Sequence, residues 1–117
     1  MAIAERTLAG VTVLDVDGRL SIETMSQIPL MLTVRRLLEE GHTRIVLNLK
    51  AVPYVDTTGM SNIVEAYLAT KRRGGALKLL HLGERVRAVL AVTGLLTIFE
   101  VFDLEAHAIA SFDTAAS

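Results

Sequence analysis

One stretch of the chain constrains its fold more than any other. Residues 43–49 read TRIVLNL, a segment rich in β-branched side chains and apolar at nearly every position. A strand with one solvated face alternates apolar and polar residues, whereas a strand buried on both faces forms a nearly continuous apolar run. Strands of the second kind lie inside sheets that helices cover. The stretch therefore predicts the central strand of an α/β domain.

Strand-like and helix-like patterns alternate along the rest of the chain. The alternation in VTVLDVDGRL predicts a strand from Val11 that ends in a turn at Gly18, with residues 3–8 as its pairing partner. Two further strands are expected over 76–82 (ALKLLHL) and 96–102 (LTIFEVF). Helical spacing predicts four helices, over 22–40, 60–71, 86–93 and 104–112. Pro29 interrupts the first of them, Gly74 and Gly75 follow the second, and Gly94 follows the third. This order predicts an α/β fold with a partly parallel sheet and right-handed crossovers.

Length and charge limit the classes of protein that the chain can belong to. With 117 residues, 1–117 form a single domain, with 113–117 as a frayed tail. The chain has 12 basic and 13 acidic residues, which gives no electrostatic footprint for a nucleic acid. The chain has no cysteine, which excludes disulfides and thiolate chemistry and fits a reducing compartment. We therefore expect no nucleic-acid partner and a cytoplasmic location.

No segment has the pattern of a membrane span or an export signal. The first ten residues, MAIAERTLAG, contain Glu5 and Arg6 and lack the apolar centre of a signal peptide. The longest weakly polar run, 88–99, is broken by Thr93 and Gly94 and is shorter than the roughly 20 residues that cross a bilayer. The apolar fraction of 51% is nevertheless high for a domain of this size, which indicates an apolar surface for a partner.

The segment VPYVDTTGMSNIVEAY, residues 52–67, places an acid, two hydroxyls and a glycine directly before a helical pattern. Asp56 is expected to be the N-cap of that helix, with its carboxylate accepting from the N–H of Thr58 or Gly59. Thr57 and Thr58 then lie in the first turn, where another protein can reach their hydroxyls. A phosphate on Thr57 gains from the positive end of the helix and is repelled by Asp56, so the fold tolerates it, whereas a packed partner does not. Phosphorylation of Thr57 would then act as a switch that releases the partner.

Catalysis by Thr57 is a weaker hypothesis. A nucleophilic hydroxyl needs a base within hydrogen-bond reach and a third group that orients the base. The three histidines, His42, His81 and His107, lie far apart in the sequence, and the glycines do not form a phosphate-binding G-x-x-x-x-G-K-[ST] pattern. We therefore expect a protein that is not an enzyme, with no metal and no cofactor.

Four segments together resemble one known family. VTVLDVDGRL, RIVLNLKAVPYVDTTGM, KRRGGALKLLHL and VRAVLAVTGLLTIFEVF follow the order of the STAS family, and DTTGM is similar to its D-[ST]-[ST]-G-[LM] phosphorylation motif. The resemblance implies a four- to five-stranded mixed sheet with about four helices packed mainly on one face. It also implies an anti-sigma factor antagonist, which binds an anti-sigma factor protein kinase and frees a sigma factor until phosphorylation switches it off and a PP2C-type phosphatase resets it.

By position, the resemblance makes Thr57 the phosphoacceptor and assigns the partner-binding surface to Asp56, Thr57, Thr58, Gly59, Met60 and Ile63. The chain departs from the family at Ser21, where an aspartate is frequent, and at Thr57, where serine is more usual. Threonine acceptors also occur in stress-signalling STAS scaffolds and in the STAS subunit of bacterial lipid-transport ABC complexes. A subunit that regulates such an ATPase is therefore the alternative hypothesis.

Overall fold

Strand β3 (Arg44–Ala51) lies in the middle of a five-stranded sheet, as its nearly continuous apolar run predicts. The computed structural model describes residues 2–20 and 30–116. β1 and β2 form an antiparallel hairpin, and every other pair of neighbouring strands is parallel. The order across the sheet is β1 (Ala2–Leu8), β2 (Val11–Asp17), β3, β4 (Ala76–Leu80) and β5 (Val101–Phe102). The predicted mixed sheet is thus confirmed, with five strands.

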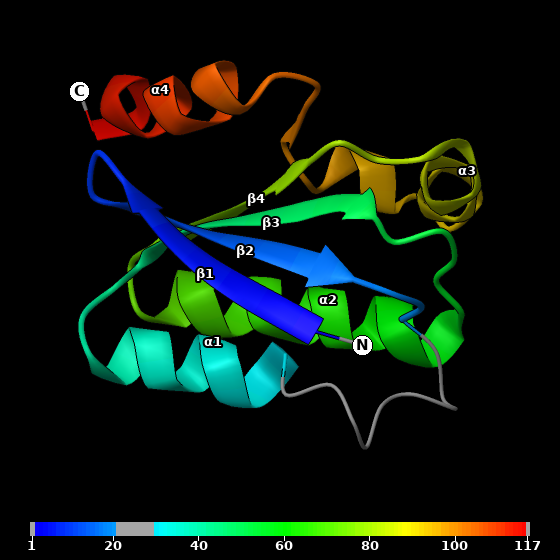
Figure 1. Ribbon diagram of the computed structural model, residues 1–117, viewed down its shortest axis with the longest axis horizontal. Coiled ribbons are helices and arrows are strands. Elements are labelled where there is room, and N and C mark those ends of the chain that lie inside the picture. Colours follow the sequence, from blue (N-terminus) through cyan, green and yellow to red (C-terminus); the bar gives the residue numbers. More distant parts are fainter. Residues whose placement is uncertain (1, 21–29, 117) are drawn as a thin grey trace.

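The helices cover both faces of this sheet, although unequally. They are α1 (Leu30–Glu39), α2 (Thr57–Arg72), α3 (Glu84–Val92) and α4 (Glu105–Ala116). Figure 1 shows α1 and α2 side by side against one face of the sheet and α4 across the opposite face. The buried residues of α3 join the same cluster as those of α1 and α2. Three of the four helices in the described part of the chain therefore share one face, in agreement with the expectation from the family resemblance.

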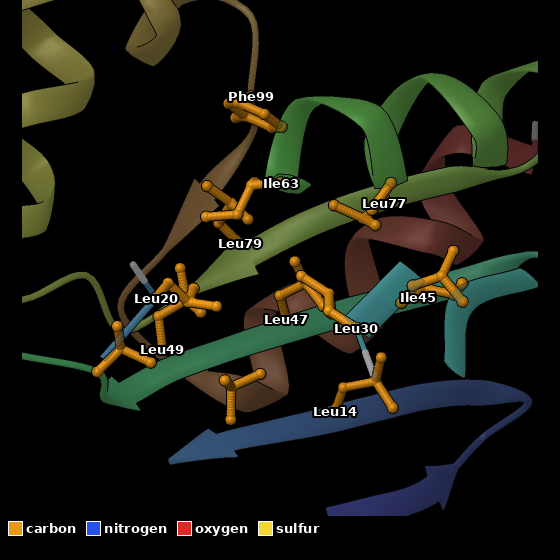
Figure 2. Packing of buried hydrophobic residues seen from close by; sticks show 14 of the residues in the cluster. Leu14, Leu20, Leu30, Ile45, Leu47, Leu49, Ile63, Leu77, Leu79 and Phe99 are labelled. Carbon is orange, nitrogen blue, oxygen red and sulfur yellow. The ribbon is translucent and has the colours of Figure 1, made fainter. Parts of the chain in front are cut away.

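The burial of β3 on both faces explains why its sequence does not alternate. Ile45 and Leu47 point into the main core between the sheet and helices α1 and α2, as Figure 2 shows. Val46 points the other way, into a smaller cluster beneath α4 that also contains Val11, Val13, Leu80, Ala108 and Phe112. Successive side chains of one strand thus supply two separate cores.

The last predicted strand differs from the structure. The predicted strand over 96–102 is wrong for most of its length, because Leu95–Thr97 forms a 3₁₀ helix and only Val101 and Phe102 pair with β4. Phe99 in this segment is buried, and its ring meets that of Tyr67 edge-on with centroids 5.0 Å apart, so it packs into the core outside any strand.

Helix α4 extends to Ala116, beyond the expected end at Phe112, and the fraying of 113–117 stays a prediction. The first part of the predicted helix over 22–40, including Pro29, lies outside the described residues, as does Ser21.

Candidate binding site at the start of helix α2

The loop between β3 and α2 is fixed to the end of β2. Val55 forms a parallel bridge with Leu20, and both side chains are buried. The N–H of Leu20 donates to the carbonyl oxygen of Tyr54, and the N–H of Asp56 donates to the carbonyl oxygen of Leu20, each at 3.0 Å. These bonds hold the start of α2 at the carboxyl edge of the parallel strands, which is where α/β sheets commonly bind ligands.

Asp56 is the N-cap of α2, as the sequence predicts. Its backbone is extended, and its carboxylate Oδ1 accepts from the N–H of Gly59 at 2.8 Å. Its carbonyl oxygen accepts from the N–H of Met60 at 2.9 Å, which begins the helical ladder. Because Asp56 makes the cap, the hydroxyl of Thr57 is not needed to start the helix.

Gly59 lets the first turn of α2 approach the backbone of Leu20. A Cβ atom on this residue would lie 2.1 Å from the carbonyl oxygen of Leu20 and 2.6 Å from its carbonyl carbon. Both atoms belong to a backbone that is already fixed by two hydrogen bonds, so it cannot move aside easily. The glycine of the DTTG motif therefore has a structural reason that does not depend on any partner.

The structure divides the predicted partner-binding residues into two groups. Thr57 is exposed, and Asp56 and Thr58 are half-buried, so these three lie at the surface. Gly59 is buried, Met60 is 6% exposed and Ile63 is 0% exposed. The assignment of Ile63 to the contact surface is wrong, because its side chain points into the main core (Figure 2). Met60, which the resemblance also assigns to this surface, belongs to the core.

Thr57 stands at the edge of a groove between α2 and the segment formed by α3 and the 3₁₀ helix. The groove has a volume of about 440 Å³. Its lining consists of one stripe of α2 and three residues from the opposite wall: Thr57, Met60, Ser61, Val64, Glu65, Leu68, Val89, Thr93 and Leu95. Met60 forms part of the floor, where its sulfur accepts from the hydroxyl of Thr93 at 3.5 Å.

Sequence reasoning missed most of this groove. The α2 wall had a visible signal, because Thr57, Ser61, Val64 and Leu68 follow one another at intervals of four, three and four residues. That spacing places them on one face of a helix, next to the core face that contains Ile63. The opposite wall had no such signal, because its position depends on how α3 packs against α2.

Charged side chains near the site contact other described residues. Glu65 on the groove wall pairs with Arg35 of α1 at 3.5 Å, and both side chains are exposed. The Arg85 guanidinium lies over the ring of Tyr54, 5.2 Å from its centroid. Arg87 is an exposed partner of Asp103 at 3.6 Å. Among the described residues, the groove beside Thr57 thus offers hydroxyls and mostly apolar surface.

Within residues 2–20 and 30–116, no group of three or more His, Cys, Asp or Glu side chains is arranged to hold a metal ion. None of the helices in that part of the chain is long and apolar enough to cross a membrane.

The fold and the site define a small α/β domain that presents a threonine hydroxyl at a capped helix start. A model of the STAS domain family matches residues 2–108, and the chain belongs to that family. It is similar to the anti-sigma-B factor antagonist of Bacillus subtilis (strain 168), with 40% identity over 53 residues that cover 45% of this chain and 49% of that protein. This match thus spans about half the length of that relative.

Two longer matches extend over nearly the whole chain. The anti-sigma F factor antagonist of Paenibacillus polymyxa is 26% identical over 109 residues, which cover 89% of this chain and 88% of that protein. The structure of the Bacillus cell fate determinant SpoIIAA in its phosphorylated form superimposes with a TM-score of 0.72 at 18% identity, covering 95% of this chain and 99% of that one. This structural likeness shows the fold.

Proposed function

We propose that the chain is an anti-sigma factor antagonist controlled by phosphorylation of Thr57. In its unmodified form it binds an anti-sigma factor that is also a serine/threonine kinase, and a sigma factor is released. The observation that carries the proposal is the exposed Thr57, placed directly after a capping aspartate in a D-T-T-G segment and beside an apolar groove. The names of the two antagonists that the chain resembles support it.

The physical basis of the switch is the difference between what the fold and the partner tolerate. A phosphate on Thr57 adds about 1.5 to 2 negative charges at the positive end of α2, where they are stabilised, and next to Asp56, where they are repelled. Since Thr57 is exposed, neither effect disturbs the core. A partner packed over Thr57 instead meets a desolvated charge, so it is released.

The protein acts by occupying a surface of its partner and not by catalysis. The kinase supplies the phosphate, and a separate phosphatase of the PP2C type removes it. The whole exchange takes place in the cytoplasm and needs no cofactor on this chain.

The experiment that tests the proposal is a binding measurement with purified anti-sigma factor kinases of the same organism. Wild type and Thr57→Ala are expected to bind, and Thr57→Ala resists release when ATP is added. Thr57→Glu is expected to bind at least about a hundredfold more weakly, because like or unpaired charges in a contact cost several kcal/mol. If Thr57→Glu binds as tightly as wild type, or if the chain instead co-purifies with a transport ATPase, the proposal is wrong.

A further inference from the structure

The groove beside Thr57 has a length that fits one short helix. Thr57 and Leu68 lie at its two ends on α2, eleven residues apart, which corresponds to about 16 Å along a helix axis. Leu68 is 42% exposed and Val64 is half-buried, so the groove leaves apolar surface uncovered on the free domain. An amphipathic helix of about three turns would cover this length.

The spacing of the α2 residues in the groove matches the contact seam of a helix pair. Thr57, Ser61, Val64 and Leu68 stand at positions i, i+4, i+7 and i+11, the pattern of a and d positions in two packed helices. The α2 side chains change from hydroxyls at the Thr57 end to an aliphatic group at the Leu68 end, and Val89 and Leu95 of the opposite wall are also apolar. An occupant therefore needs small or polar residues at one end and large apolar residues at the other.

From this pattern we infer that the anti-sigma factor inserts an amphipathic helix into the groove, antiparallel to α2. The inference rests on the proposed function and specifies which part of the partner the site receives. Thr57, the proposed phosphoacceptor, is itself a wall residue, so the groove is continuous with the surface that phosphorylation controls.

Charge sets the direction of the bound helix. The N-terminal end of α2, at Thr57, carries partial positive charge, which favours the partially negative C-terminal end of the occupant. Among the described lining residues the charged side chain is that of Glu65, near Leu68, and it favours the positive N-terminal end of the occupant or a basic residue there. The partner Arg35 of Glu65 is exposed and weakens this second attraction without reversing it.

The antiparallel arrangement also explains how phosphorylation releases the partner. A phosphate on Thr57 reverses the sign of the charge that faces the C-terminal end of the bound helix. The repulsion acts at the polar end of the groove, while the apolar end stays intact. Phosphorylated protein is therefore expected to lose affinity without losing its fold.

The first test compares partner binding by two variants, Leu68→Glu and Leu32→Glu. Leu68→Glu places a charge in the apolar end of the groove and is expected to weaken binding of the purified anti-sigma factor kinase by at least about tenfold, as loss of a buried interface residue does. Leu32→Glu is the matched control, because Leu32 is a 68% exposed leucine of α1 that does not line the groove, and it is expected to bind as wild type does. Circular dichroism confirms that both variants are folded.

The outcomes separate the inference from the proposed function. If Leu68→Glu binds as wild type does while Thr57→Glu does not bind, the groove inference is overturned and the proposed function stands. If wild type binds no anti-sigma factor, both are overturned. Equal weakening in Leu32→Glu and Leu68→Glu also overturns the inference, because the effect is then not specific to the groove.

The second test determines what lies in the groove and in which direction. The chain has no cysteine, so Ser61→Cys and Leu68→Cys each carry a single photo-crosslinking label. In the complex, the label at 61 is expected to attach to the C-terminal half of one partner helix and the label at 68 to its N-terminal half. Attachment in the reverse order, to a loop or strand, or to a second copy of this chain overturns the inference.

Discussion

Gly59 illustrates how a motif residue can be required by the fold alone. We expect Gly59→Ala to lower the free energy of unfolding by about 1 to 3 kcal/mol, the usual cost of forcing an extra group into a packed site, because its Cβ would overlap the Leu20 carbonyl group. Urea denaturation followed by circular dichroism measures the change. Gly83→Ala is the control: a Cβ at Gly83 has nothing within 4 Å, and we expect it to cost less than about 1 kcal/mol, the usual scale of a cap substitution. Equal effects in the two variants would contradict the steric argument.

At the scale of the elements, Arg6 ties the edge hairpin to α4. Its guanidinium donates to the carboxylates of Asp15 in β2 and Glu105 at the start of α4, with 2.9 Å from Nη2 to Oδ1 of Asp15. Asn48 of β3 donates to the same Asp15 oxygen at 2.8 Å. The pKa of Asp15 lies below its ordinary value of 3.8, chiefly because Arg6 donates hydrogen bonds to its carboxylate. The hydrogen bond from Asn48 and the positive charge of Arg6 act in the same direction, and partial burial acts in the opposite direction. The same contacts raise the pKa of Arg6, which stays charged.

This network predicts acid sensitivity of the hairpin and α4. Because the pKa of Asp15 is lower in the folded state, its contribution to stability is complete above the unfolded pKa and is lost as the pH falls through the folded value. We expect the free energy of unfolding to decline below about pH 5, and to decline less steeply in Asp15→Asn, which has no charge to titrate. Urea titrations at several pH values measure both slopes. Parallel pH profiles for the two proteins would show that Asp15 does not contribute.

Lys78 is a second attachment of α4 to the sheet. It is 3% exposed, and its Nζ donates to the hydroxyl of Ser111 at 2.8 Å and pairs with Glu100 at 3.1 Å. The ammonium group also lies 4.4 Å from the centroid of the Phe112 ring. We expect Lys78→Ala to cost about 2 to 4 kcal/mol, because it leaves a cavity beneath α4.

Lys78→Met is the matched variant, because methionine fills most of the volume without a charge. We expect it to cost less than about 1.5 kcal/mol, since replacing a buried ionic group by an apolar one of similar size is often nearly neutral. Thermal and urea unfolding of both variants measure the difference. If both cost the same, the charge of Lys78 and not its volume holds α4.

The elements differ in how far the sequence could predict them. β3 and α2 were predictable because the apolar pattern of each follows from which of its side chains are buried. In β3, Ile45 and Val46 point to opposite cores, and in α2, Ile63 lies at helical spacing from the other buried residues. β5 was not predictable, because aromatic and β-branched residues in 96–102 are equally suited to a strand and to irregular core packing, and Phe99 takes the second role. In the site, the Asp56 cap was predictable from local chemistry, whereas the second wall of the groove depends on how α3 packs against α2.

At the scale of the whole molecule, the domain consists of one central strand between two cores of unequal size. Strand β3 contributes to both, whereas β1 is an edge strand with mostly exposed residues and α4 covers only the smaller cluster. Local opening requires less free energy where fewer apolar contacts are broken. We therefore expect amide hydrogen exchange to be slowest in β3 and β4 and faster in β1 and α4.

The same measurement tests whether the Thr57 switch acts on the surface alone. Thr57 is exposed at the first position of α2. Gly59 in the same turn packs against the backbone of Leu20, and Met60 belongs to the main core. Hydrogen exchange of Thr57→Glu is therefore expected to match wild type throughout β3 and β4 and to differ only near the first turn of α2. Exchange detected by mass spectrometry after peptic digestion resolves these segments. Loss of protection in β3 would mean that a negative charge at Thr57 loosens the core, and weaker partner binding by this variant would then reflect a change of fold and not repulsion in the contact.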